Sequence, residues 1–131
     1  MDFSSQQLRN ISIAGHGQTG KTTLFEHLLF VGKVLSRPEP VASGKTVSDS
    51  SAEEIQRKIS VYSSLANVKW DNTLINIWDT PGSSDFTGEV ISAFRSSELA
   101  LILVDARSGA QIETIKLWRD LDRRNKPRIV F

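Results

Sequence analysis

A glycine-rich stretch constrains the fold of this chain more than any other feature. Residues 15–22 read Gly-His-Gly-Gln-Thr-Gly-Lys-Thr, which is a glycine, four residues and then Gly-Lys-Thr. The apolar run at residues 8–14 suits a buried strand, and residues 21–31 are apolar at helical spacing. Glycines let such a loop curl so that backbone N–H groups point at phosphate oxygens, and the helix start adds partial positive charge. We therefore predict a strand, a phosphate-binding loop and a helix.

The loop supplies candidate ligands for a nucleoside triphosphate. We expect contacts to the nucleotide from Gly15, His16, Gly17, Gln18, Thr19, Gly20, Lys21, Thr22 and Thr23. Lys21 would reach the β and γ phosphates, and the Thr22 hydroxyl would bind a magnesium ion, which prefers oxygen ligands. The competing interpretation is a plain glycine turn between a core strand and a helix, but the flanking strand and helix favour phosphate binding.

A second motif supports the first. The apolar residues 74–78 end in Asp79-Thr80-Pro81-Gly82, an acidic residue at the tip of a predicted strand followed by a glycine turn. In phosphate-loop proteins an acid at this place holds magnesium directly or through water, and the glycine N–H can meet the γ-phosphate. We therefore add Asp79 and Gly82 to the nucleotide site.

Composition excludes several classes of protein. The chain has 131 residues, a length typical of one domain, and its formal net charge of +1 gives no field that would attract nucleic acid. The absence of cysteine excludes disulfides and thiolate metal sites. No apolar run approaches the roughly 20 residues of a membrane span, and residues 1–7 lack the pattern of an export signal. We expect a cytoplasmic protein with neither a membrane nor a DNA partner.

Strand and helix patterns alternate along the rest of the chain. A turn at residues 71–72 separates a strand-like pattern at residues 59–70 from the strand at 74–78, so we expect an antiparallel pair. Three elements follow: a helix with Val90, Ile91 and Phe94 inward, a strand at residues 99–104, and a helix at about residues 111–124 with Ile112, Ile115, Trp118 and Leu121 inward. A last strand begins at Arg128. The alternation predicts an α/β three-layer fold, with helices on both faces of a mainly parallel sheet that has one antiparallel edge strand.

The segment at residues 33–54 has a different character. Serine, proline and glycine punctuate it, and it has no apolar period. It is either a disordered linker or a functional segment, and a loop this long after a phosphate loop is more often functional, becoming ordered when nucleotide binds.

At this point several separated stretches resemble one family. They are Arg9-Asn10-Ile11, Gly20-Lys21-Thr22-Thr23, residues 75–82, Asp85-Phe86, Glu89-Val90 and Pro127-Arg128-Ile129. Together they closely resemble the GTPase domain of elongation factor G and its relatives, which include the tetracycline-resistance ribosomal protection proteins. The polar segment is similar to that family's first switch through Gly44, Thr46, Asp49, Glu54, Arg57, Ile59 and Ser60. The resemblance implies a phosphate-loop G-domain fold, GTP or GDP with Mg²⁺, and a ribosome as partner of the whole protein.

The resemblance also implies roles for single residues. Thr22, Ser60 and Asp79 would hold the metal, and Lys21, Gly82 and the residue at position 83 would take part in hydrolysis. The family's water-positioning histidine is Ser83 in this chain, and its first-switch threonine is Ser60. The other departures are Gly17 in place of an apolar gate residue, Gln18 in place of an acid and Lys58 in place of a glycine. Such changes are similar to those in divergent, second-type elongation factor G-like proteins, and they indicate slow intrinsic hydrolysis.

Two alternatives to a ribosome-associated GTPase stay open. One is a nucleotide-dependent binding module with little or no hydrolysis, and the other is a phosphate-loop ATPase, because the family's guanine-reading Asn-Lys-x-Asp motif does not occur in residues 1–131. We interpret residues 1–131 as the N-terminal part of a GTP-binding domain, truncated at its C-terminal side. An uncovered strand edge would then be open to self-association.

Overall fold

A five-stranded sheet is the centre of the computed structural model, which describes residues 3–48 and 60–131. The strands are β1 (Leu8–Gly15), β2 (Ser64–Trp70), β3 (Thr73–Asp79), β4 (Leu99–Leu103) and β5 (Arg128–Val130). The helices are α1 (Lys21–Val31), α3 (Thr87–Ser96) and α4 (Ile112–Arg123), with short 3₁₀ turns η1 (Ser5–Gln7), η2 (Val41–Ser43) and η3 (Ser84–Phe86). The strand order is β2-β3-β1-β4-β5, so β1 lies in the middle.

Strand direction follows the expected pattern. β1 pairs in parallel with β3 and with β4, and β4 pairs in parallel with β5. β2 and β3 form the antiparallel pair around the turn at residues 71–72, which confirms the mainly parallel sheet with one antiparallel edge strand. β2 begins at Ser64, later than the pattern from residue 59 predicted, and residue 59 lies outside the described residues. Just before β2, the backbone N–H of Ser63 bonds to the Glu89 carboxylate 3.1 Å away on α3.

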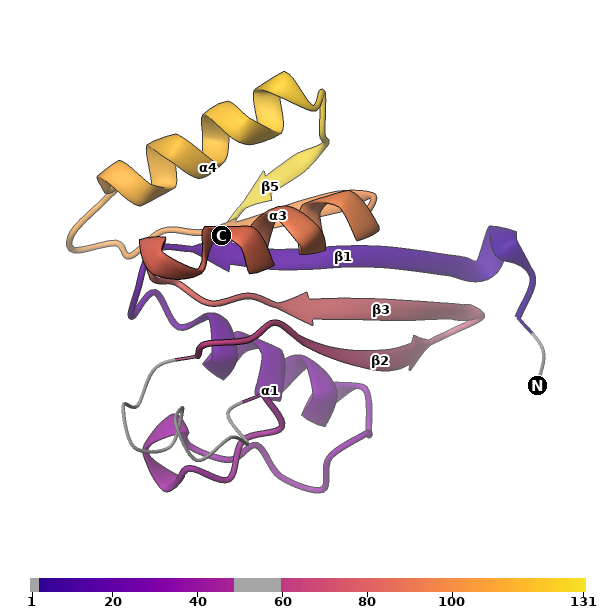
Figure 1. Ribbon diagram of the computed structural model, residues 1–131. Coiled ribbons are helices and arrows are strands. Elements are labelled where there is room, and N and C mark those ends of the chain that lie inside the picture. Colours follow the sequence, from indigo (N-terminus) through magenta and orange to yellow (C-terminus); the bar gives the residue numbers. More distant parts are fainter. Residues whose placement is uncertain (1–2, 49–59) are drawn as a thin grey trace.

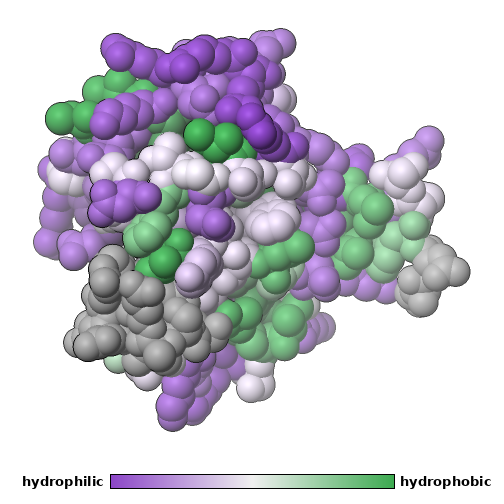
Figure 2. All heavy atoms as spheres, in the orientation of Figure 1, coloured by the Kyte–Doolittle hydropathy of each residue, from purple (hydrophilic) through white to green (hydrophobic). Residues whose placement is uncertain are grey.

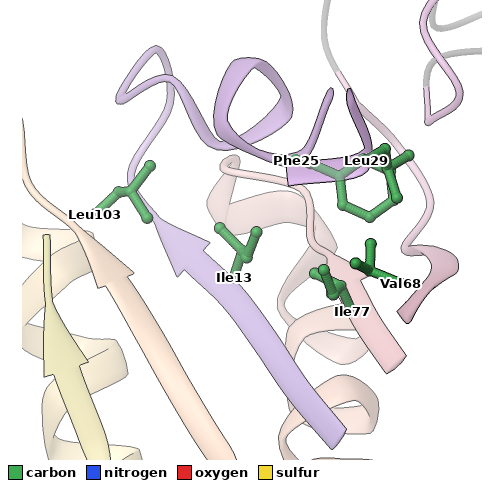
Figure 3. Packing of buried hydrophobic residues seen from close by; sticks show 6 residues of the cluster. All are labelled: Ile13, Phe25, Leu29, Val68, Ile77 and Leu103. Carbon is green, nitrogen blue, oxygen red and sulfur yellow. The ribbon is translucent and has the colours of Figure 1, made fainter. Parts of the chain in front are cut away.

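Helices cover both faces of the sheet. α1 lies on one face, and α3 and α4 lie on the other (Figure 1). Successive residues of β1 point to opposite faces, so Ile13 faces α1 while Ala14 faces α3 and α4. Under α1, the core consists of Ile13, Phe25, Leu29, Val68, Ile77 and Leu103 (Figure 3). On the other face it consists of Ala14, Val90, Phe94, Ala100, Ile102 and Leu121. The two cores hold the carboxyl ends of β1, β3 and β4 at one edge.

The expected inner face of α4 is wrong in three of its four residues. Leu121 is fully buried, but Ile112 is 67% exposed, Ile115 46% and Trp118 38%. The helix instead buries Leu121 and Thr114 and packs Leu117 against the core of that face. An apolar stripe predicts which face of a helix is buried. In α4, however, the packing of Leu117 and Leu121 against the core determines which face of the helix is turned toward the sheet.

The misplaced stripe forms part of an exposed apolar surface, which we call the α4–β5 patch. It consists of Ile112, Ile115 and Trp118 from α4 with Val130 from β5, whose strand partner Ile102 lies in the core of the same face. Ile129 is also exposed but pairs with Leu101 of the core under α1, so it faces the other side of the sheet. The Arg128 guanidinium lies 4.1 Å from the centre of the Trp118 ring and joins β5 to α4. Hydrophobic atoms interrupt the mostly hydrophilic surface near α4 in Figure 2. Among the described residues β5 pairs only with β4, so its outer edge is unpaired.

One further property bears on the class of protein. In the described part of the chain, residues 3–48 and 60–131, no helix has the length and apolar character needed to cross a lipid bilayer.

Two substitutions on α4 test its orientation. Leu121→Ala should lower the free energy of unfolding by about 2–5 kcal/mol, because it removes methyl groups from a closed core. Ile112→Ala, the matched control on the exposed stripe, should change it by less than about 0.5 kcal/mol. Urea unfolding followed by circular dichroism measures both, and equal losses would show that α4 faces the sheet differently.

Candidate functional site: a phosphate-binding loop

The loop between β1 and α1 has the geometry that its glycines predict. Gly15 ends β1 with φ at +155°, and a Cβ there would lie 2.5 Å from the backbone oxygen of Leu103, so only glycine fits. Gly20 has φ at +87° and precedes the first residue of α1. Gln18, which is not a glycine, also has a positive φ of 65°. A non-glycine residue in this region stores strain, and such residues cluster at ligand sites.

Internal bonds fix the loop around one carbonyl. The Thr19 hydroxyl donates to the backbone oxygen of His16 at 3.0 Å, and the Lys21 ammonium donates to the same oxygen at 2.7 Å. The His16 ring is 3.2 Å from the Thr114 hydroxyl, measured from Nδ1 to Oγ1, which ties the loop to α4. The loop is therefore held between the helices of both faces.

Lys21 is a buried cation at the base of the site. Its residue is only 7% exposed. Burial lowers the pKa of its ammonium from 10.5 to about 8, and the nearby Asp79 carboxylate raises the pKa and offsets part of that shift. Such a cation is short of compensating charge, which is the electrostatic condition that favours a phosphate ligand.

Three oxygen groups converge beside Lys21. The Thr22 hydroxyl donates to the Asp79 carboxylate at 2.8 Å and lies 3.4 Å from the Ser60 hydroxyl. In the described part of the chain, no group of three or more His, Cys, Asp or Glu side chains could hold a metal alone. One carboxylate with two hydroxyls fits magnesium, which is commonly held by one or two carboxylates together with substrate phosphates and water. Thr22, Ser60 and Asp79 are the residues that would hold it.

The turn after β3 folds over the loop. The Thr80 hydroxyl and backbone N–H both donate to the Ile13 oxygen, at 2.7 and 3.3 Å, and this anchors the turn to β1. A Cβ on Gly82 would lie 2.5 Å from the Lys21 nitrogen and 2.9 Å from the backbone of Gly17. The lack of a side chain at Gly82 lets the two loops approach each other this closely.

Most of the expected site residues surround one cavity of about 460 Å³. Its walls are Gly17, Gln18, Gly20, Lys21, Thr22, Thr23, Val41, Ser60, Gly82 and Ser83. The other four lie around it: Asp79 bonds to Thr22, Thr19 bonds to His16, and Gly15 and His16 line neighbouring cavities. Val41 is a wall residue that the sequence did not reveal, because an isolated valine in a polar segment carries no motif.

Ser83 lines the cavity, and its hydroxyl already takes part in a hydrogen bond. It precedes η3, and its hydroxyl accepts a long hydrogen bond of 3.4 Å from the Asp85 backbone N–H. A serine hydroxyl is a weak base, and this one caps a turn.

Comparison with known proteins agrees with this geometry. The family model described as "Elongation factor Tu GTP binding domain" matches residues 6–131. This chain belongs to that family. It is a G-domain sequence of the type found in elongation factor G-like translational GTPases, which confirms the family resemblance.

Relatives of this GTP-binding domain include whole translation factors. The chain is 39% identical over 123 residues to an elongation factor G-like protein of Mycobacterium tuberculosis (strain ATCC 25618 / H37Rv), an alignment that covers 94% of the chain and 17% of that protein. It is 38% identical over 128 residues to the mitochondrial ribosome-releasing factor 2 of Drosophila willistoni, with 97% and 17% covered. The chain thus spans about a sixth of the length of these relatives.

Solved structures give the same fold. The crystal structure of ttk003000868 from Thermus thermophilus superposes with a TM-score of 0.91 at 31% identity, covering 95% of this chain and 19% of that one. Translation elongation factor SelB from Methanococcus maripaludis, in complex with the GTP analogue GppNHp, superposes with a TM-score of 0.71 at 29% identity, covering 99% and 22%. These neighbours confirm the G-domain fold.

The lowered pKa of Lys21 can be measured directly. In the folded protein without ligand, NMR titration of the lysine side chains should show one group with a midpoint near 8, because burial opposes its charge. Its signal should be missing in Lys21→Arg, and Asp79→Asn should lower the midpoint further because the carboxylate raises this pKa. In denaturant the midpoint should return toward 10.5. A folded-state midpoint near 10.5 would contradict the burial of this cation.

Proposed function

We propose that residues 1–131 act as the N-terminal part of the GTP-binding domain of an elongation factor G-like translation factor, which binds GTP with Mg²⁺ and hydrolyses it slowly. The observation that carries this proposal is the cavity of about 460 Å³ at the start of α1. Its walls combine Gly17, Gln18 and Gly20 of the glycine loop, the buried Lys21 cation and the hydroxyl-bearing residues Thr22 and Ser60. Membership of the GTP-binding domain family supports guanine as the base.

Different residues of the site have different proposed roles in phosphate binding, metal binding and hydrolysis. Lys21 and the loop N–H groups would bind the β and γ phosphates, and Thr22, Ser60 and Asp79 would hold the metal, which would neutralise charge on the phosphates. Gly82, which lies close to Lys21 and Gly17, would donate its backbone N–H to the γ-phosphate. By the family resemblance, the residue at position 83 would orient the water that attacks the γ-phosphorus, but the hydroxyl of Ser83 cannot act as an imidazole does. Hydrolysis then depends mainly on positioning and charge stabilisation.

One observation favours a second candidate function, a nucleotide-dependent binding module with little or no hydrolysis. Every group assigned to phosphate and metal is present, whereas position 83 carries a capped serine. An ATPase is a weaker alternative, supported only by the lack of a guanine-reading motif in these residues.

We also propose the setting in which the domain acts. The names of its relatives, an elongation factor G-like protein and a ribosome-releasing factor, support a ribosome as partner of the whole protein. We propose the cytoplasm as its location, with an organelle as the alternative, because one relative is named mitochondrial. The unpaired edge of β5 and the α4–β5 patch support self-association of the 131-residue chain, which sedimentation at several concentrations would detect.

Removing phosphate and metal ligands tests the binding site. Lys21→Ala should weaken GTP binding by about 10- to 100-fold, because it deletes a charge-assisted hydrogen bond to phosphate. Thr22→Ala should weaken it less and reduce its dependence on Mg²⁺, because the metal loses a hydroxyl ligand. Calorimetry of the full-length protein with GTP, GDP and ATP, with and without Mg²⁺, measures this, and unchanged affinity in both variants would contradict the phosphate site.

Restoring an imidazole tests the hydrolysis assignment. Ser83→His should raise ribosome-stimulated GTP turnover, because an orienting group is worth roughly 10²–10⁴ in rate. Ser83→Ala is the matched control and should leave the slow rate nearly unchanged, since the serine hydroxyl only caps η3. Single-turnover phosphate release from the full-length protein measures both variants. Wild-type turnover as fast as that of a histidine-bearing elongation factor G would show that another residue orients the water.

A further inference from the structure

A buried carboxylate on α1 has no part in the site described so far. Glu26 is 1% exposed, although it is a charged residue in the middle of the helix that starts the nucleotide site. Its neighbour Phe25, and Leu29 one turn further, pack on the sheet as fully buried core residues. Burying a carboxylate is costly unless strong hydrogen bonds compensate for the lost water. Glu26 must therefore have hydrogen-bond partners that offset the free-energy cost of burying its carboxylate.

Those partners are two backbone N–H groups of the polar segment. The N–H of Glu39 donates to Oε2 of Glu26 at 3.2 Å, and the N–H of Val47 donates to Oε1 at 2.5 Å. Each carboxylate oxygen thus receives one charge-assisted bond. The donors are eight residues apart, so the single side chain of Glu26 pins both ends of residues 39–47, which we call the 39–47 segment.

The pinned segment reaches the nucleotide cavity. Between its two ends it forms η2 and then turns at Gly44, whose φ is +64°. Val41, in η2, is the residue of this segment that lines the cavity. Because Glu26 holds both ends of the segment on α1, it limits where Val41 can lie.

The same helix carries the metal ligand. Thr22 and Glu26 are four residues apart on α1, a spacing that places two side chains on one face of a helix. Thr22 bonds to Asp79 at one end of this face, and Glu26 bonds to the 39–47 segment at the other. One rigid element therefore positions both the floor of the cavity and part of its wall.

We propose that Glu26 is a positioning residue that holds the 39–47 segment against α1, so that Val41 closes one side of the nucleotide cavity and slows the release of bound nucleotide. This inference rests on the proposed function of that cavity. Only a carboxylate suits the role, because it offers two acceptor oxygens and no donor. Glutamine of the same size keeps one acceptor but turns an N–H₂ group toward the other backbone N–H.

Hydrogen exchange of the ligand-free full-length protein tests the contact itself. In Glu26→Gln, the amide of Glu39 or Val47 should exchange about ten- to a hundredfold faster, the effect of losing a hydrogen bond to a charged group. In Glu26→Ala both amides should do so. The matched control is Glu98→Gln, which makes the same change at an exposed carboxylate before β4 and should leave both amides protected. Unchanged protection in both Glu26 variants would overturn the proposal.

A second pair of variants keeps the test independent of the folding of Glu26 mutants. Glu39→Pro deletes one N–H donor and leaves Glu26 in place, in a segment that already holds Pro38 and Pro40. It also removes the exposed ion pair between Arg37 and Glu39, so Arg37→Ala is its control. With one end of the 39–47 segment released from Glu26, the other end should open more often. The amide of Val47 should therefore exchange faster in Glu39→Pro and not in Arg37→Ala.

The rate of nucleotide release distinguishes a positioning role of Glu26 at the cavity from a purely structural role. Release of fluorescent GDP from the full-length protein should be about three- to tenfold faster in Glu26→Gln and Glu39→Pro than in the two controls, with the association rate nearly unchanged. Faster amide exchange with an unchanged release rate would overturn the positioning role. Failure of the wild-type protein to bind GDP would overturn the proposed function instead, and the exchange data would still show whether Glu26 holds the segment.

Discussion

The parallel pairing of β1 with β3 determines where every other group at the candidate site lies. Ile13 pairs with Asp79 in this register, and the Ile13 oxygen accepts both hydrogen bonds from Thr80. The phosphate loop and the acidic turn therefore leave the sheet at the same edge, with Thr22 and Asp79 in contact. A shift of one residue would turn each side chain of β3 to the other face. The apolar cores on both faces oppose such a shift, so packing far from the cavity preserves its geometry.

Helix α1 has one apolar face that packs on the sheet and one polar face that bonds to other segments. Phe25 and Leu29 pack on the sheet, while Thr22 and Glu26 face polar groups of other segments. The apolar spacing of this helix, taken alone, predicts only a core helix. Thr22 and Glu26 fix the rotation of α1 about its axis, because each side chain reaches its hydrogen-bond partners in only one orientation of the helix.

The sequence predicted the elements whose signals are local. The bounds of α1 agree with the expectation, and β1 differs by one residue, because a glycine loop ends the strand and starts the helix. The convergence of Thr22 and Asp79 was predictable for the same reason, since parallel strands end at one edge. The face of α4 was not, because Ile112 and Leu121 differ in what covers them and not in composition. Val41 and Glu26 were also missed, since their importance comes from contacts between residues 13 or more positions apart. The assigned roles of the single site residues remain predictions.

The buried ammonium of Lys21 has a thermodynamic consequence of its own. With a pKa of about 8, this group has lost its proton in a large share of molecules in mildly alkaline solution. A polyanion favours the charged form and raises the pKa on contact, so it binds together with a proton. The heat of binding then contains the ionisation enthalpy of the buffer, and its value differs between phosphate and Tris at the same pH. The phosphate loop of this domain is in this sense also a proton acceptor.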